Sequence, residues 1–295
     1  MSDRATIYIS AITPRGNHGE IDFGAFFELI DFANTSGLSG IALFGPAGEY
    51  AALRCDERSR LLYLAVKRSR LPVLAGVGAA TMDDSVTLAR EARDAGAAAL
   101  LLPPPYFYQY DQSDIREFYL EFAAHVGRGA SVYLANTPEY TSSITPETAR
   151  ELMETGLFAG MADSSWGGQS WPQPAFSGPL LSANDATFLK ARTAGVGVIS
   201  EIACALPELP LALDNALVAG RHAEVERLDR MLHDFLAWMQ QFPPLAALKT
   251  AAAARGLKAG PLSIPIPPDK RMRLEEFSGW FRGALAAIQR ASAKA

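Results

Sequence analysis

The sequence has little cysteine, no long apolar run and no cluster of basic residues. Only two of its 295 residues are cysteines, Cys55 and Cys204, and their wide separation predicts free thiols rather than a disulfide. No stretch of about 18 uninterrupted apolar residues is present, so we expect no membrane as a partner. Lysines and arginines are scattered through a chain of net charge −5, which argues against nucleic acid as a partner. The first residues lack the layout of a signal peptide, and we expect a cytoplasmic protein.

The remaining composition is that of a globular protein with a large core. Hydrophobic residues make up 49% and charged residues 20% of the chain. Short apolar runs alternate with amphipathic stretches of helical period. The runs lie at residues 7–13, 40–44, 72–78, 97–102, 131–137, 157–164, 178–184 and 197–202.

Continuously apolar strands, each followed by one helix, indicate a parallel sheet buried on both faces. Eight such units predict an α/β protein, a (β/α)₈ TIM barrel, over residues 1–220. An open doubly wound sheet is the alternative. Against it, the first turn between strand and helix, residues 13–19, has no G-x-G-x-x-G motif.

Helix boundaries can be predicted at several points. Thr81 is an expected N-cap, and so is Thr145, which precedes a proline at the first helical position. After the eighth strand only helical periodicity remains, at residues 206–219, 223–241, 244–255 and 274–293. We therefore expect residues 221–295 to form an all-helical C-terminal extension packed on the barrel.

Five short motifs, in this order along the chain, resemble those of a known family. G-P-A-G-E at 45–49 resembles G-T-T-G-E, P-P-Y-F at 104–107 resembles T-P-Y-Y, and L-A-N-T-P at 134–138 resembles L-Y-N-x-P. G-M-A-D-S-S at 160–165 resembles G-I-K-D-S-S, and G-V-I-S at 197–200 is unchanged. The chain thus resembles the pyruvate-dependent class I lyases typified by dihydrodipicolinate synthase and N-acetylneuraminate lyase. The resemblance implies a TIM barrel, a small 2-keto acid-like ligand, and a homo-oligomer, tetramer or dimer.

The same resemblance places apolar residues at the family's catalytic positions. Ala162 stands where the family has the lysine that forms a Schiff base with the keto acid. Ala135 replaces the tyrosine that relays protons, and Pro46 and Ala47 replace two threonines. Phe107 replaces a tyrosine that in the synthases reaches into a neighbouring subunit's site. The catalytic residues are therefore unknown, and imine chemistry, which needs an amine, is doubtful.

No other lysine is expected to take over that role. The six lysines fall on predicted helices or C-terminal loops, and the nearest to a strand end is Lys190, for which an exposed surface position is expected. We expect no cofactor and no metal, because the four histidines do not lie at strand ends. The acidic residues near the strand ends are expected to cap helices or accept hydrogen bonds, with Asp185 as an N-cap. They are Glu49, Asp163, Asp185 and Glu201.

The resemblance also implies a set of substrate-binding positions at the strand ends. With lysine and tyrosine replaced by alanine, the pocket should be wider and more apolar than a pyruvate site. The exception would be a pocket filled by Phe44, Tyr108, Tyr140 or Trp166. The implied binding residues are Gly45, Gly48, Glu49, Asn136, Tyr140, Asp163, Ser164, Ala183 and Ile199.

Three functional interpretations remain open. The first is a lyase-family protein that has diverged, or is impaired, in aldolase or dehydratase chemistry. The second is an active aldolase in which Ala162 was engineered in place of lysine. The third is a non-catalytic binding or assembly barrel. Self-association is expected from the resemblance and from an apolar helix face, for which an internal core is the alternative; this face comprises Leu232, Phe235, Leu236 and Trp238.

Overall fold

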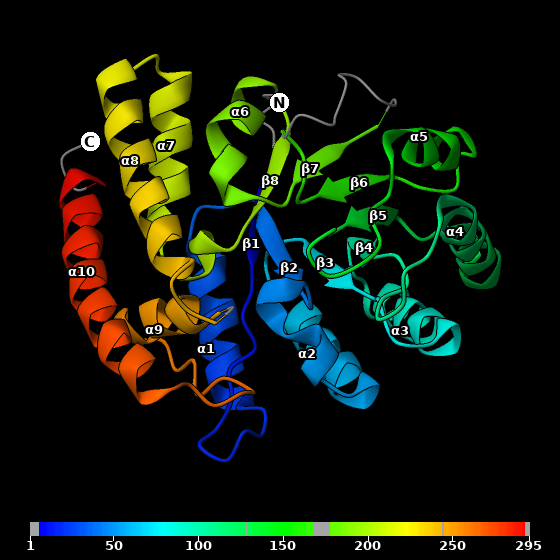
Figure 1. Cartoon of the computed structure of the whole chain (residues 1–295), viewed down its shortest axis with the longest axis horizontal. Coiled ribbons are helices and arrows are strands. Elements are labelled where there is room, and N and C mark those ends of the chain that lie inside the picture. Colours follow the sequence, from blue (N-terminus) through cyan, green and yellow to red (C-terminus); the bar gives the residue numbers. More distant parts are fainter. Residues whose placement is uncertain (1–5, 128, 168–177, 244, 293–295) are drawn as a thin grey trace.

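The chain forms a closed barrel of eight parallel strands, as predicted (Figure 1). The computed structural model describes residues 6–127, 129–167, 178–243 and 245–292. Each strand pairs with the next, and β8 closes on β1 with Tyr8 opposite Ile199. The open sheet is thereby excluded. The strands are β1 Ile7–Ser10, β2 Gly40–Leu43, β3 Val73–Gly76, β4 Ala99–Leu102, β5 Val132–Asn136, β6 Gly160–Asp163, β7 Leu180–Ser182 and β8 Gly197–Ser200.

Helices connect the strands and cover the outside of the barrel, except that the described residues between β6 and β7 contain no helix. Thr81 Oγ1 accepts a hydrogen bond from Asp84 N at the start of α3, and Thr145 Oγ1 accepts one from Thr148 N at the start of α5. Both predicted N-caps are confirmed. The helices are α1 Phe23–Asn34, α2 Cys55–Arg68, α3 Met82–Ala95, α4 Gln112–Val126, α5 Pro146–Glu154, α6 Phe188–Thr193 and α7 Glu208–Val218. Short 3₁₀ turns are η1 Pro46–Gly48, η2 Tyr50–Ala52, η3 Asp185–Thr187 and η4 Ile202–Cys204.

The interior of the barrel is lined by small and branched side chains. Alternate residues of a strand face opposite sides, so Met161 packs outward against the helices while Ala162 faces the bore. Four of the eight buried bore residues are alanines, a composition that leaves space near the strand ends. The bore residues are Ala42, Leu74, Ala99, Leu101, Ala135, Ala162, Leu181 and Ile199.

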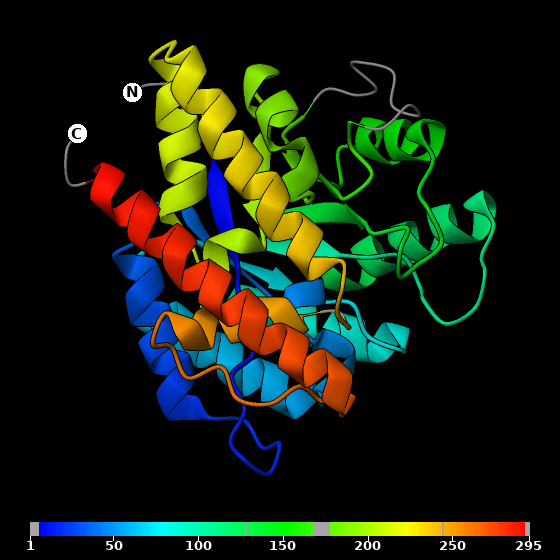
Figure 2. The same cartoon turned by 60° about the vertical axis from the view of Figure 1, so that its left-hand side comes forward.

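Three further helices complete the chain: α8 His222–Met239, α9 Ala246–Ala254 and α10 Pro268–Ser292. Helices α7, α8 and α10 lie side by side on one flank, and α10 also packs on α9 (Figure 2). Helix α10 begins at Pro268, six residues before the predicted start at 274. None of the helices in the described ranges is both long and apolar enough to cross a membrane.

The apolar face of α8 belongs to an internal core. Leu232 and Phe235 are fully buried within the chain, and the Phe235 ring lies 5.6 Å from the rings of Phe277 and Phe281 on α10. The internal core was the alternative to self-association for this face. These residues therefore do not support an oligomer. We still expect one, on the ground of the family resemblance.

Candidate functional site

A cavity of about 260 Å³ opens at the carboxyl ends of the strands. Every strand contributes to its wall, either with its last residues or with the loop that follows, from Ser10 at the end of β1 to Glu201 after β8. In TIM barrels this end carries the active site. The volume is at the small end for ligand pockets, which run to about 300–1,000 Å³. The cavity is the candidate functional site.

The structure brings together most of the residues singled out from the sequence. Of the four aromatic residues that were considered able to fill the pocket, Phe44 and Tyr140 line the cavity. Trp166 is buried elsewhere and Tyr108 is exposed. Other predicted positions that line it are Gly45, Pro46, Ala135, Ala162, Ser164, Ala183 and Ile199. Ala47, Gly48, Glu49, Phe107, Asn136 and Asp163 are not among the residues found to line it.

The inner wall of the cavity on the side of β5 and β6 is made of two alanines. Ala135 and Ala162 are direct neighbours across the β5–β6 pair, and Leu181 of β7 follows on the other side of Ala162. Both alanines face the bore and both line the cavity. Neither side chain carries a group that could attack a carbonyl or move a proton.

Asn136 and Asp163 hold the neighbouring loops together. Both are fully buried, and Asn136 Nδ2 donates to Asp163 Oδ1 at 2.9 Å. The same carboxylate oxygen accepts from Ser165 N and Ser165 Oγ, while Asn136 Oδ1 accepts from Ile144 N. Burial raises the pKa of Asp163, and the hydrogen bonds from Ser165 and Asn136 oppose that rise. These groups position the ends of β5 and β6 from behind the cavity.

Glu201 is a cavity residue to which sequence reasoning gave only a structural role. It directly follows β8, keeps partial exposure and lines the cavity. Burial raises its pKa to about 7, and the negative charges of Asp185 and Glu139 add to the rise. The signal was available in the sequence, because an acidic residue directly after the G-V-I-S strand must lie at the barrel mouth.

Two other carboxyl groups share this part of the wall. Asp185 is buried and its Oδ2 accepts hydrogen bonds from the backbone nitrogens of Glu201 and Ile202, at 2.9 and 3.1 Å. Burial raises the pKa of Asp185. The expected N-cap position belongs instead to Asn184, whose side chain accepts from Ala186 N. Glu139 Oε2 accepts from Ser164 Oγ at 2.6 Å.

The raised pKa of Glu201 predicts a pH-dependent stability difference between the protein and its Glu201→Gln variant. The folded state binds the proton more tightly than the unfolded state, so the contribution is fully present below pH 4.5 and is lost as the pH rises through about 7. The full shift corresponds to about 3 kcal/mol. Urea unfolding at about pH 5 and about pH 8 should show the native protein losing stability relative to Glu201→Gln as the pH rises.

The exposed Glu117 on α4 provides the matched control. Its Glu117→Gln variant should follow the native protein at both pH values, because this exposed side chain is not among the residues that line the cavity. If the Glu201→Gln difference were the same at the two pH values, the assignment of a raised pKa to Glu201 would be wrong.

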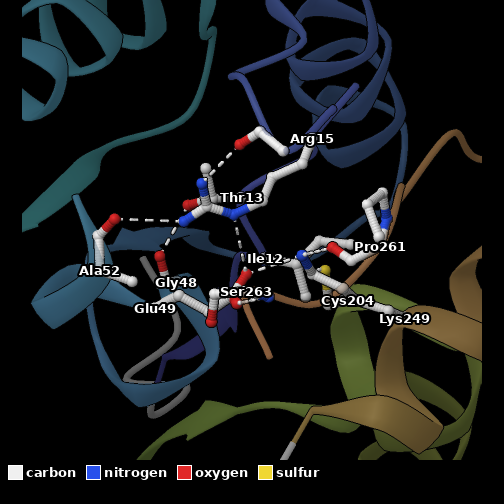
Figure 3. Close-up of polar contacts among 11 residues, drawn as sticks. Ile12, Thr13, Arg15, Gly48, Glu49, Ala52, Cys204, Lys249, Pro261 and Ser263 are labelled. Atoms are coloured by element: carbon white, nitrogen blue, oxygen red, sulfur yellow. Dashed lines mark hydrogen bonds and ion pairs between the residues drawn. The ribbon is translucent and has the colours of Figure 1, made fainter. Parts of the chain in front are cut away.

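Behind the loop that follows β2 lies a second group of charged side chains (Figure 3). Lys249 Nζ on α9 lies 2.6 Å from Glu49 Oε2 and donates to Pro261 O, and the two side chains are only 4% and 6% exposed. Burial lowers the pKa of Lys249, while Glu49 opposes that change. Burial alone would raise the pKa of Glu49, but Lys249 and Ser263 hold it below its usual range. Lys249 was expected to be an ordinary helix residue, so its burial was missed.

Neither Lys249 nor Lys190 is among the residues that line the cavity. Lys190 donates to Gly167 O and its Nζ lies 6.0 Å from the ring of Trp166. Arg58 on α2 is 2% exposed and donates to the carbonyl oxygens of Gly76 and Gly78, two residues of the wall. Each of these three cations therefore binds to other groups of the protein. The backbone of Gly76 and Gly78 lies between Arg58 and the cavity.

The fold and the location of the cavity define the chain as a TIM barrel with a cavity at the strand ends. Residues 4–279 match the dihydrodipicolinate synthetase family. The protein belongs to this family of pyruvate-dependent class I lyases.

Named relatives and solved structures agree with this assignment. The chain is 30% identical over 270 residues to the 4-hydroxy-tetrahydrodipicolinate synthase of Desulfotalea psychrophila, covering 88% of this chain and 90% of the relative. It is 32% identical to the synthase of Salinibacter ruber, covering 87% of each. The structure of the Ruminococcus gnavus sialic acid aldolase superposes with a TM-score of 0.86 at 20% identity, over 97% of this chain and 100% of that one. At this identity the last comparison supports the fold.

Proposed function

We propose that this protein is a divergent lyase-family barrel that binds a small ligand in the strand-end cavity without forming an imine to it. One observation carries the proposal: β6 presents Ala162 to the cavity, beside Ala135 of β5. No lysine occurs among the described residues of the wall. The family resemblance suggests a 2-keto acid-like ligand, held between the positions singled out above. We further propose a cytoplasmic homo-oligomer, as the family resemblance suggests.

The remaining chemistry of the cavity is acid–base chemistry. With a pKa of about 7, Glu201 populates both protonation states at neutral pH, which suits a group that gives and takes a proton. Burial raises the pKa of Tyr140, with the charges of Glu201 and Glu139 adding to the rise, so its hydroxyl stays protonated as a donor. Without an imine, the activation that these two groups offer a carbonyl is hydrogen bonding. Aldolase or dehydratase turnover should therefore be slow or absent.

Reductive trapping tests the proposal directly. Incubation with pyruvate and borohydride should leave the intact mass of the protein unchanged. The buried Lys249 is held by Glu49, and an exposed lysine with a pKa of about 10.4 is protonated and a poor nucleophile. A stoichiometric adduct on one specific lysine would overturn the proposal, and the modified peptide would identify the true nucleophile.

A non-catalytic binding or assembly barrel is the second candidate. Phe107 favours it: the ring is 86% exposed, packs only edge-on against Tyr108 among the aromatic contacts found, and takes a left-handed backbone conformation with φ of 81°. An exposed aromatic pair of this kind suits contact with another protein surface. Ligand binding without turnover, together with loss of self-association in Phe107→Ser, would favour this candidate over an enzyme.

A further inference from the structure

The charged groups of the cavity wall all have the same sign. Glu139, Asp185 and Glu201 line it, and none of its described residues is lysine, arginine or histidine. Residues 168–177, which the structure does not describe, also include no residue of these three types. A ligand carboxylate would have to enter beside these groups without a cationic partner on the described wall. Unpaired charge of this kind is costly to bury.

The aromatic side chains of the wall favour the opposite sign of charge. Phe44, Tyr50 and Tyr140 all line the cavity. The faces of aromatic rings carry partial negative charge and attract cations within about 6 Å of the ring centre. Two of these rings already show this behaviour, because the Arg58 guanidinium carbon lies 5.6 Å from the centre of Phe44 and 5.5 Å from that of Tyr50.

Arg58 is the cation that could favour an anionic ligand, and its surroundings limit that effect. Its two terminal nitrogens donate to Gly76 O at 2.6 Å and Gly78 O at 2.7 Å, so both are already engaged by backbone carbonyl groups. The guanidinium group of Arg58 lies behind the wall, whereas three carboxyl groups lie in the wall itself. The family's two threonine hydroxyls are also absent here, and Pro46 has no backbone N–H to offer an anion.

We propose that the ligand of this cavity carries a protonated nitrogen, an amine or an iminium group, which faces Glu201 and is flanked by the aromatic wall. The proposal rests on the cavity being the functional site and names its ligand class. A 2-keto acid would then enter as a derivative in which a nitrogen of the ligand itself takes the place of the keto oxygen and the carboxyl group is masked, because the described wall offers a carboxylate no cationic partner. The missing lysine nitrogen is in this way supplied by the ligand, and no covalent step with the protein is required.

The protonation of Glu201 links this binding to pH. The groups that act on its charge are Asp185 of η3, Glu139 and Tyr140 of the loop after β5, and Cys204 of η4. A cation binds to the ionised form of Glu201 and a carboxylate to the protonated form. Because the pKa is about 7, affinity for a cation should rise about tenfold from one pH unit below that value to one unit above. For a carboxylate the change should run in the opposite direction.

Three probes with the same ring and different charge test the proposal: cyclohexylammonium, cyclohexanol and cyclohexanecarboxylate. Calorimetry on the full chain, one pH unit below and one above 7, should rank the cation first, with the expected tenfold gain at the higher pH. The Glu201→Gln variant should lose this pH dependence and bind the cation more weakly. Glu117→Gln, in an exposed position on α4, should behave like the native protein.

The outcomes separate this proposal from the function on which it rests. Tighter binding of the carboxylate, or equal binding of all three probes, would overturn the ligand class and leave the cavity as the binding site. Binding of none of them would contradict both proposals. A pH dependence that persists in Glu201→Gln would also overturn the assignment, because the titrating group would lie elsewhere. The ranking in the native protein needs no variant, so a misfolded mutant cannot hide the result.

Discussion

The Ala162→Lys variant is expected to gain the covalent adduct that the native protein lacks. The new side chain would start from β6, face the bore and extend into the cavity of about 260 Å³. Incubation with pyruvate and borohydride should then add one pyruvyl group to the protein, identified by peptide mass mapping at position 162. The expected change is from no labelling to labelling of a large part of the protein.

Two opposing effects set the pKa of this new amine. Burial in the bore disfavours the ammonium form and lowers the pKa, whereas a negative charge on Glu201 favours it. The double variant Ala162→Lys/Glu201→Gln removes the second effect and should be labelled faster at neutral pH. Ala237→Lys, on an exposed position of α8, is the control for a lysine in water and should show no specific adduct.

Turnover is expected to stay poor even when the adduct forms. Ala135 and Pro46 provide no hydroxyl group for the proton relay, and general acid–base assistance is worth about 10²–10⁴-fold. Full aldolase or dehydratase activity in Ala162→Lys would contradict this expectation. It would favour the interpretation that Ala162 was engineered into an otherwise active enzyme.

Replacing Lys249 by methionine should cause a large loss of stability. Lys249 and Glu49 form a buried ion pair at 2.6 Å, and removal of Lys249 leaves the buried Glu49 carboxylate with the more distant Arg15, whose Nε lies 3.8 Å from Glu49 Oε2. Such changes cost about 3–5 kcal/mol. For a chain of this size the midpoint of thermal unfolding should fall by roughly 10 °C. Calorimetric or circular dichroism melting curves measure the effect.

Lys258 offers a matched control for Lys249. It also pairs with a glutamate, Glu28, at 2.9 Å, but both side chains are at least 49% exposed. Surface pairs contribute about 0–1 kcal/mol, so Lys258→Met should melt close to the native protein. The double variant Lys249→Met/Glu49→Leu should recover part of the loss, since the buried carboxylate is removed while Arg15 keeps its hydrogen bonds to Gly19 O and Ala52 O. Equal melting points for the two single variants would show that the buried pair does not stabilise the fold.

The sequence predicted the barrel because each of its elements leaves a local pattern. Apolar strands such as residues 97–102 and caps such as Thr81 are set by neighbouring residues, and the structure confirms both. The cavity position also followed, since the strand ends of a parallel barrel must meet. Strand lengths were overestimated, because apolar residues of the adjoining loops extend the pattern beyond the hydrogen-bonded ladder.

The electrostatics of the site could not be predicted in the same way. The raised pKa of Glu201 depends on Glu139 and Asp185, which come from two other loops. The burial of Lys249 depends on Glu49, 200 positions away in the chain. None of these partners belongs to the local strand or helix pattern around the residue whose charge it affects. Pairings of this kind arise from tertiary packing, and a single sequence carries no signal for them.

The contact between Glu49 and Lys249 also has a consequence for how the protein is made. The loop after β2 emerges from the ribosome well before its partners Lys249 and Ser263, which follow Glu49 by at least 200 positions in the chain. Domains tend to fold during synthesis from the N-terminal end, and long-range contacts form slowly. A chain released after α7 would carry all eight strands and Arg15, and would still lack Lys249 and Ser263 as partners of Glu49. Helix α9 thus completes the contacts of the loop after β2 only once all the barrel strands have been made.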